Sequence, residues 1–330
     1  MTVFCPLPFN NLKIDSFGRV FNCCYQNTPI GNIFKDSISD IFNGVKNLEI
    51  RENIKNSNLH SICKESGNCP KIYVKNMHQI KEVRPQHLEI ELPNYSCNIG
   101  GSTPTPTSAC LMCPRSSLDF IPQEEDYTHK ILNKIKPVFP FLKSFTVTGL
   151  AEPFYKNNIF NVLDYINFAK YKASVSLNVI TNATLLNKNM AEKFVKYVSN
   201  GNVTFSVDAG NAATYKKIRR FSNFRRVVGN IKDFNKAKLD TISTNLNFNL
   251  NALNIKEYKE MLNIASFTGT QVVVFRPTIV SFNKNNLEKI SLSLLKKDEL
   301  NFIETDIVNI SNNLKIDVKF VVPLTSVHNE

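Results

Sequence analysis

Cysteines are the residues of this chain whose type and spacing most directly indicate chemistry. Eight are present, and none follows residue 113. One group is Cys5, Cys23, Cys24, Cys63 and Cys69, and the other is Cys97, Cys110 and Cys113. An even number of cysteines suits either disulfides in a secreted chain or thiolates that bind metal in a reducing compartment. The start of the chain lacks the basic flank and apolar run of a signal peptide. We therefore expect two metal sites in a cytoplasmic protein.

The second cysteine group gives three thiolates without a fourth cysteine or a histidine nearby. Such an incomplete set leaves one coordination position open. A catalytic metal, or an iron-sulfur cluster with one accessible iron, requires that open position. Taken alone, Cys110-Leu-Met-Cys113 suits a zinc knuckle equally well.

Nine residues, 100 to 108, interrupt this group with the sequence Gly-Gly-Ser-Thr-Pro-Thr-Pro-Thr-Ser. Without them the cysteines have the spacing CX3CX2C, which resembles the radical S-adenosylmethionine (radical SAM) enzymes. Lengthening the intervening loop from 3 to 12 residues costs only ~1.2 kcal/mol of loop-closure entropy. Pro104 and Pro106 lack an N–H to donate to a strand. We therefore expect residues 100 to 108 to form an exposed loop outside the barrel that this resemblance implies.

Further motifs follow in the order in which that family has them. Thr148-Gly149-Leu150-Ala151-Glu152 resembles the family's glycine-glycine-glutamate segment, whose carboxylate binds the ammonium of the methionine moiety. Strand alternation is expected to place Ser206 and Asp208 on one face, where they suit the two hydroxyls of a ribose. Each residue alone is equally explained as a helix cap or turn residue. The resemblance implies a cofactor-binding set of Met112, Gly149, Glu152, Asn182, Ser206, Asp208 and Arg219.

Membership of this family would imply a 4Fe-4S cluster on Cys97, Cys110 and Cys113, with S-adenosylmethionine on its fourth iron. Reductive cleavage of S-adenosylmethionine would then give a 5′-deoxyadenosyl radical that abstracts a substrate hydrogen. The protein's part is to orient the cofactors and to exclude water and oxygen. The resemblance also implies a reducing partner such as flavodoxin or ferredoxin.

The first cysteine group resembles a SPASM domain, which holds an auxiliary iron-sulfur cluster in many radical SAM enzymes. A hairpin that turns at residues 15 to 18 would bring Cys5 close to Cys23 or Cys24. A helix would then bring Cys63 and Cys69 back to these cysteines. Four thiolates complete one auxiliary 4Fe-4S cluster, so one of Cys23 and Cys24 is spare. A zinc site made by four thiolates is the alternative interpretation.

From residue 86 onward, short apolar runs alternate with amphipathic stretches, as expected of βα units. Strands are expected at 88 to 92, 144 to 149, 174 to 182, 202 to 208, 241 to 249 and 271 to 280. Helices are expected near 124 to 136, 156 to 170, 186 to 198, 211 to 236, 254 to 265 and 285 to 297. Six such units predict an α/β fold with a parallel sheet, either doubly wound or curled into a partial barrel. The resemblance implies the partial (β/α)6 TIM-like barrel.

The two ends of the chain complete this outline. A last helix near 299 to 313 and a strand beginning at Ile316 are expected to close the sheet edge. Residues 1 to 85 have few apolar residues for their length and one helical stretch near 36 to 56. We expect them to form a small cysteine-rich domain that depends on metal, and residues 86 to 330 to form the barrel.

Composition limits the function classes further. The chain has 330 residues, 42% of them apolar, which excludes disorder as the main state, and no apolar run is long enough to span a membrane. Its net charge of +12 favours an anionic partner, but scattered lysines make nucleic acid the weaker interpretation. We expect an enzyme that modifies a peptide or protein side chain. The alternatives are oxidation or epimerisation of a sugar or other small metabolite, and an inactive zinc-binding or nucleic-acid-binding relative.

Overall fold

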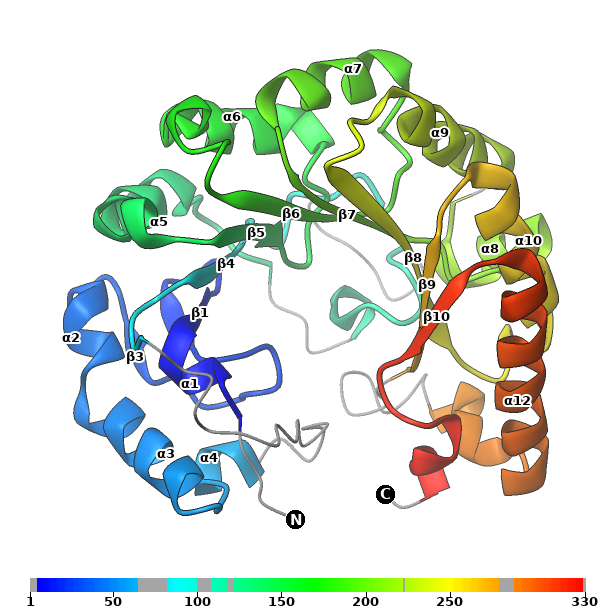
Figure 1. Ribbon diagram of the computed structural model, residues 1–330, viewed down its shortest axis with the longest axis horizontal. Helices are drawn as coiled ribbons and strands as arrows, with labels where there is room; N and C mark the ends of the chain where they lie inside the picture. Colours follow the sequence, from blue (N-terminus) through cyan, green and yellow to red (C-terminus); the bar gives the residue numbers. More distant parts are fainter. Residues whose placement is uncertain are drawn as a thin grey trace. The chain divides into compact units, whose positions relative to one another are not determined.

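The computed structural model describes residues 5–64, 82–99, 108–117, 122–221, 223–278 and 288–328 (Figure 1). Cys69 and almost all of the 100 to 108 segment lie outside these ranges, so the expectations for both stay predictions. Within the described residues, no helix combines the length and the apolar character needed to cross a membrane.

Within the described ranges, ten strands form a mostly parallel sheet with the order β10-β9-β8-β7-β6-β5-β4-β1-β2-β3. Their bounds are β1 Asn11–Ile14, β2 Arg19–Phe21, β3 Gly31–Asn32, β4 His87–Glu91, β5 Ser144–Thr148, β6 Ser176–Thr181, β7 Gly201–Ser206, β8 Ile242–Leu250, β9 Val272–Pro277 and β10 Asp317–Phe320. The six strands expected after residue 86 are confirmed as β4 to β9, and the expected closing strand is β10, parallel to β9.

The helices lie between these strands along the chain. Their bounds are α1 Leu7–Asn10, α2 Ile38–Phe42, α3 Val45–Lys55, α4 Ser61–Lys64, α5 Thr128–Ile135, α6 Asn158–Tyr165, α7 Lys188–Tyr197, α8 Ala212–Arg219, α9 Phe224–Ala237, α10 Tyr258–Thr268 and α12 Lys297–Leu314. Helix follows strand repeatedly from β5 onward, as the βα pattern of the sequence predicts.

Two of the expected helices are each broken into two. The stretch near 36 to 56 is interrupted at Gly44, which is the N-cap of α3. The stretch from 211 to 236 ends its first helix at Arg220, whose φ of 58° is left-handed, and Asn223 then caps α9 by accepting a hydrogen bond from the Arg226 N–H.

The helix expected over 285 to 297 is wrong in its described part. Residues Glu288–Ile290 and Leu292–Leu294 form short 3-10 turns, and α12 begins only at Lys297. The Ser291 hydroxyl accepts a hydrogen bond from the Ser293 N–H, a local bond that competes with helix formation.

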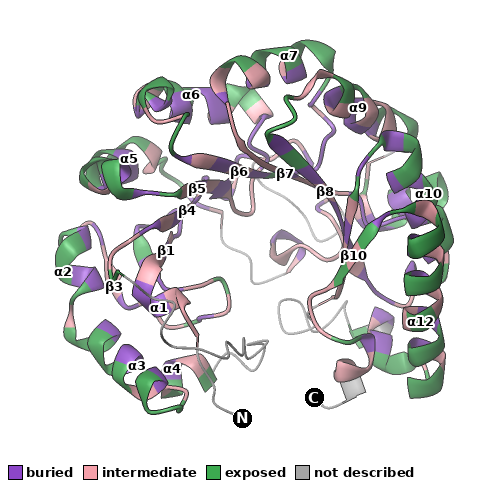
Figure 2. Ribbon diagram, in the orientation of Figure 1, coloured by how far each residue is buried: buried purple, intermediate pink, exposed green. Residues whose placement is uncertain are grey.

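The chain divides into two compact units, and the first contains Met1–Asn94, Gln123–Ala151 and Asn157–Asn178. Strand β1 joins β2 through the expected hairpin, in which the Gly18 N–H donates to the Asp15 carbonyl at 3.0 Å. Strand β1 also pairs in parallel with β4, so that Leu12 lies beside Leu88. Both of these leucines are buried, and Figure 2 shows β1 and β4 as a mixture of buried and intermediate residues.

The second unit contains Tyr95–Pro122, Glu152–Lys156 and Val179–Glu330. Helices α7, α9, α10 and α12 lie along one side of strands β7 to β10 (Figure 1). Buried aromatic rings fill this side: the Phe205 and Phe234 rings lie 5.6 Å apart, and those of Phe248 and Phe275 lie 5.7 Å apart. Residues that alternate with these apolar side chains face the other side of β7 and β8, and they are polar: Asn202, Thr204, Ser206, Asn245, Asn247 and Asn249. This polar side carries the candidate site.

Candidate functional site

The segment that contains Cys97, Cys110 and Cys113 lies in the second unit and is anchored to α8. The Leu111 N–H donates to the Ile218 carbonyl at 2.8 Å, and the Cys110 thiol donates to the Arg219 carbonyl at 3.5 Å. The Cys113 N–H closes a turn onto the Cys110 carbonyl at 3.0 Å. None of the described cysteines is in a disulfide. The structure therefore presents thiols, held by main-chain bonds, where the sequence predicts cluster ligands.

Burial dominates the acidity of these thiols. It raises the pKa of Cys97 to about 11 and that of Cys113 to about 12, and it raises the pKa of Cys110 in the same direction. The neighbouring guanidinium of Arg115 opposes the shift at all three. Because metal ligands must be thiolates, assembly of the predicted cluster on these thiols would release protons, and a nearby positive charge would favour it.

Arg115 is a site residue that the sequence reasoning missed. Its side chain is only 2% exposed, and its Nη1 donates to the Ile99 carbonyl at 2.9 Å. It therefore links the segment after Cys97 with the segment after Cys113. The available signal was its position, two residues after Cys113, where a buried cation would offset the negative charge of thiolates that bind the predicted cluster.

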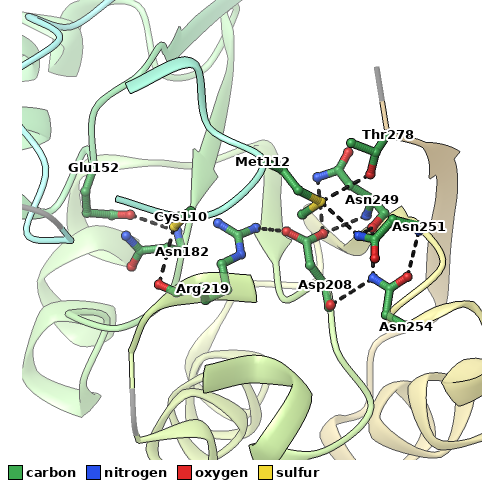
Figure 3. A network of polar contacts seen from close by, with 10 residues as sticks. All are labelled: Cys110, Met112, Glu152, Asn182, Asp208, Arg219, Asn249, Asn251, Asn254 and Thr278. Carbon is green, nitrogen blue, oxygen red and sulfur yellow. Dashed lines mark hydrogen bonds and ion pairs between the residues drawn. The ribbon is translucent and has the colours of Figure 1, made fainter. Parts of the chain in front are cut away.

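Glu152 is buried, and both of its carboxylate oxygens are bound; Figure 3 shows the bond from Asn182. Oε1 accepts from the Thr181 hydroxyl at 2.7 Å and from the Phe154 N–H at 3.2 Å, and Oε2 accepts from the Asn182 N–H at 2.7 Å. Burial raises the pKa of Glu152, while these three hydrogen bonds and the Arg219 charge oppose that shift. The carboxylate is therefore fixed in one orientation at the end of β6.

Asn182 connects the end of β6 to the segment that carries Cys97. Its Nδ2 donates to Asn98 Oδ1 at 3.2 Å, and its Oδ1 accepts from the Thr184 N–H at 2.9 Å. Asn98 in turn donates to the Thr184 hydroxyl at 2.8 Å. The structure thus brings Asn182 to the cysteine segment, and it adds Asn98, a neighbour of Cys97 that the sequence reasoning did not single out.

Asp208 and Arg219 form a buried ion pair (Figure 3). Asp208 Oδ1 also accepts from the Asn249 N–H at 2.6 Å and from Asn249 Nδ2 at 3.1 Å. Burial lowers the pKa of Arg219, but Asp208 and Cys110 raise it more, so its net shift is upward. The Arg219 Nε is buried without a hydrogen-bond partner among the described residues, and it therefore remains available for a ligand.

Strand β7 ends at Ser206, two residues earlier than predicted. Asp208 has a left-handed φ of 60°, so the alternation used to place Ser206 and Asp208 on one face does not extend to Asp208. The half-buried Ser206 side chain makes no hydrogen bond to any described residue. Its hydroxyl is thus free to bind a ligand.

Met112 lies against polar side chains that directly follow strands β8 and β9 (Figure 3). Its thioether sulfur accepts from Asn251 Nδ2 and from the Thr278 hydroxyl, each at 3.1 Å. Asn254 joins this group by accepting from the Asn251 N–H at 2.8 Å and by donating to the Asp208 carbonyl at 3.0 Å. These partners were missed, although asparagine at every second position from 245 to 251 was visible in the sequence.

Gly149 belongs to the first unit. Its φ is +118°, and an added Cβ would lie 3.0 Å from Glu91 Cβ and 3.2 Å from the Leu92 nitrogen. Only glycine fits both the conformation and the space. The close packing of β5 against β4 therefore explains this glycine, and its part in cofactor binding stays a prediction.

The described N-terminal cysteines, Cys5, Cys23, Cys24 and Cys63, lie in the first unit. Cys23 is close enough to Cys5, Cys24 and Cys63 for their charges to interact. Burial raises the pKa of Cys23 to about 12, whereas Cys24 is exposed. Across the described ranges, no three Cys, His, Asp or Glu side chains have the geometry for a single metal ion. Because Cys23 is half-buried and close to Cys5 and Cys63, it is better placed than the exposed Cys24 to share a metal site with them.

Comparison with known families identifies both parts of the chain. The profile described as the radical SAM superfamily matches residues 102–265, and that of the SPASM iron-sulfur cluster-binding domain matches residues 5–70. Radical SAM domains bind a 4Fe-4S cluster and S-adenosylmethionine, and SPASM domains bind an auxiliary iron-sulfur cluster. The half-buried thiols near Arg115 fit the 4Fe-4S cluster, and the unpartnered Arg219 Nε fits S-adenosylmethionine.

A probable GTP 3′,8-cyclase of Methanocaldococcus jannaschii is 28% identical over 205 residues, which are 60% of this chain and 60% of that protein. The present chain thus spans less than two thirds of that relative. The crystal structure of Streptococcus suis SuiB bound to S-adenosylmethionine has a TM-score of 0.51 at 13% identity, over 94% of this chain and 70% of that one. The structure of native anSMEcpe with bound AdoMet has a TM-score of 0.50 at 15% identity, over 70% of this chain and 63% of that one. These likenesses agree with the partial TIM barrel. The chain belongs to the radical SAM superfamily and has an N-terminal SPASM iron-sulfur cluster-binding domain.

Proposed function

We propose that this chain is an enzyme that removes a hydrogen atom from a peptide or protein side chain. The observation that carries the proposal is the gathering, within the second unit, of Cys97, Cys110 and Cys113 with the Arg115 cation, Glu152 and the Asp208–Arg219 pair. When bound, the 4Fe-4S cluster and S-adenosylmethionine supply a 5′-deoxyadenosyl radical.

Three side chains of the second unit are suited to hold S-adenosylmethionine. Oε2 of Glu152 accepts one described hydrogen bond and can accept another from the ammonium of the methionine moiety. The unpartnered Arg219 Nε suits the carboxylate, and the Ser206 hydroxyl suits a ribose hydroxyl. Met112, fixed by Asn251 and Thr278, lies between the cluster ligands Cys110 and Cys113 and forms an apolar contact for the adenosyl group.

In the first unit, Cys5, Cys23, Cys63 and Cys69 are proposed to hold the auxiliary 4Fe-4S cluster. A cluster ligated by four cysteines has no open iron, so it suits electron transfer rather than substrate binding. A flavodoxin or ferredoxin is proposed as the reductant of the enzyme. We propose an auxiliary-cluster domain over residues 1 to 85 and a barrel domain over residues 86 to 330.

A peptide substrate is favoured by one structural neighbour, which was solved with a precursor peptide bound. The structure of SuiB bound to precursor peptide SuiA has a TM-score of 0.50 over 94% of this chain, at 12% identity. The residues on the polar side of β7 and β8 also carry hydrogen-bonding groups that can bind the main chain of a peptide. A small-molecule substrate is the second candidate, favoured by the 28% identity to the probable GTP 3′,8-cyclase.

The first test is reductive cleavage of S-adenosylmethionine by the full chain. After anaerobic reconstitution with iron and sulfide, dithionite should give 5′-deoxyadenosine, measured by mass spectrometry. Joint replacement of Cys97, Cys110 and Cys113 by alanine should abolish this product and leave only the auxiliary iron. Full cleavage by the triple variant would refute the cluster assignment.

The second test separates the two substrate classes. The enzyme is incubated with peptides from a perdeuterated cell digest, or with the perdeuterated small-molecule fraction of the same cells. Transfer of deuterium into 5′-deoxyadenosine from the peptide pool supports the proposal. Transfer from the small-molecule pool alone would replace it with the second candidate.

A further inference from the structure

Two side chains of β8 and β9 lie on the polar side of the sheet, opposite the buried aromatic rings, and have polar atoms without a partner among the described residues. Arg276 makes no ion pair with any described residue, and its Nε is buried without a hydrogen bond. Asn247 is 6% exposed, and its Oδ1 is likewise buried and unpartnered. Burying a polar atom without a partner costs free energy. The presence of two such atoms in the folded chain therefore indicates a ligand that forms hydrogen bonds with them.

The strand register places these groups close together. Asn249 of β8 is paired with Arg276 of β9, and Asn247 is paired with Val274. Arg276 is thus the diagonal neighbour of Asn247 on the same face of a parallel pair, within reach of one small ligand group. Their apolar neighbours Phe248 and Phe275 lie on the opposite face, in the core.

The position is next to the proposed cofactor site rather than remote from it. Asn249, the cross-strand neighbour of Arg276, hydrogen-bonds to the Asp208 carboxylate. Asp208 in turn is paired with Arg219. A ligand group held by Arg276 therefore lies one strand away from the residues proposed to hold S-adenosylmethionine, where a substrate must approach.

We infer that Arg276 and Asn247 bind a carboxylate and an adjacent amide N–H of an acidic peptide substrate. A guanidinium Nε–H donates to a carboxylate oxygen, and a carboxamide Oδ1 accepts from an N–H. An aspartyl or glutamyl residue of a peptide carries both groups within a few bonds. The net charge of +12 favours such a substrate. This inference rests on the proposed function and names the substrate class for it.

The carboxylate of S-adenosylmethionine is the competing occupant of Arg276. Arg219 is the better candidate for that role, because it lies beside Cys110 and has its own unpartnered Nε. Arg276, by contrast, is cross-strand from Asn249 and makes no hydrogen bond to the cysteine segment among the described residues.

The test uses the reconstituted full chain and two nonapeptides of glycine and serine, acetylated and amidated, with either Glu or Gln at the centre. Affinities are measured by saturation-transfer NMR in the presence of S-adenosylmethionine. The wild type should bind the glutamyl peptide at least ten-fold more tightly than the glutaminyl peptide. Arg276→Gln should abolish this preference, Arg276→Lys should keep part of it, and Asn247→Leu should weaken binding of both peptides.

Arg225→Gln is the matched control, because it removes the same charge from an exposed position on α9. It should keep the wild-type preference. Equal affinity of the wild type for both peptides, or a preference that survives Arg276→Gln, would overturn the inference. A ten-fold loss of S-adenosylmethionine affinity in Arg276→Gln would also overturn it, because Arg276 would then bind the cofactor instead of the peptide.

The proposed function fails in a different way. The wild type could prefer the glutamyl peptide through Arg276 and yet transfer deuterium only from small molecules. That result would support the binding inference and refute the proposed removal of hydrogen from a peptide. If deuterium comes from peptides without any preference for acidic ones, the proposed function stands and this inference falls.

Discussion

At the scale of single residues, the adjacent thiols Cys23 and Cys24 have opposite surroundings. Cys23 is half-buried near Cys5 and Cys63, whereas Cys24 is exposed. We therefore expect Cys23→Ala to lose about four iron atoms per chain, the content of one 4Fe-4S cluster, while Cys24→Ala keeps them. Iron and acid-labile sulfide analysis of both reconstituted variants measures this. Equal iron content in the two variants would contradict the assignment.

His87 gives a pH dependence whose sign follows from its surroundings. Burial and the Lys143 charge lower its pKa below the ordinary value of about 6.5. The folded state therefore disfavours the protonated ring, and its stabilising contribution is present above pH 6.5 and is lost as the pH falls below it. His87→Gln retains a partner for the Ser144 hydroxyl, which lies 2.8 Å from His87 Nδ1.

Urea unfolding at pH 7.5 and 5.5 measures this effect. The wild type should lose more free energy of unfolding between the two values than His87→Gln does. An equal loss in both proteins would show that the His87 ring does not sense this pH range.

The site residues that could be predicted are those at strand ends, because their place follows from the order of elements. Glu152, Asn182 and Ser206 each follow or end a recognisable apolar run. The partners of Met112 could not be predicted in this way, since Asn251 and Thr278 lie 139 and 166 residues away along the chain. Such contacts depend on tertiary packing, which local patterns do not encode.

At the scale of elements, two glycines in helical regions should respond oppositely to alanine. An added Cβ at Gly44, between α2 and α3, would lie 2.7 Å from the Asp40 carbonyl oxygen, while nothing lies within 4 Å of one at Gly229 in α9. Gly44→Ala should therefore destabilise the chain by about 1 to 3 kcal/mol through overpacking. Gly229→Ala should stabilise it by about 0.5 to 1 kcal/mol, because alanine loses less backbone entropy in a helix.

The midpoints of urea unfolding of the two variants provide the comparison. Each serves as the control for the other, since both add one methyl group. Destabilisation of similar size in both would mean that the space around Gly229 is filled in solution.

The strands could be predicted better than the helices for a physical reason. Apolar, β-branched runs in a buried parallel sheet are continuous and bounded by polar residues, as in β9. The break between α8 and α9 has no glycine or proline within 219 to 223, and it depends on the left-handed conformation of Arg220. Its only local signal was Asn223, a good N-cap that also occurs within helices.

At the scale of the whole molecule, the first 85 residues share a sheet with the strands after them. Leu12 and Ile14 of β1 are fully buried beside Leu88 and Ile90 of β4. Removing residues 1 to 85 loses these two side chains, which alone removes about 3 to 6 kcal/mol of burial free energy. We expect residues 86 to 330 alone to unfold at clearly lower urea concentration than the full chain.

Circular dichroism during urea unfolding of both proteins measures this. The full chain carrying Cys23→Ala is the control, since it removes only a proposed cluster ligand. If residues 86 to 330 unfold at the same midpoint as the full chain, the proposed boundary separates two independently stable domains.

The parallel pairing of β1 with β4 also has a consequence for synthesis on the ribosome. Asn11 is partnered by His87, so about 75 residues must be translated between the two strands. At ordinary elongation rates this takes roughly 4 to 15 s. During that interval one edge of β1 has no strand to bind, and such an edge recruits other nascent chains. The yield of soluble protein should therefore respond to translation speed and chaperone supply more than to the stability of the finished fold.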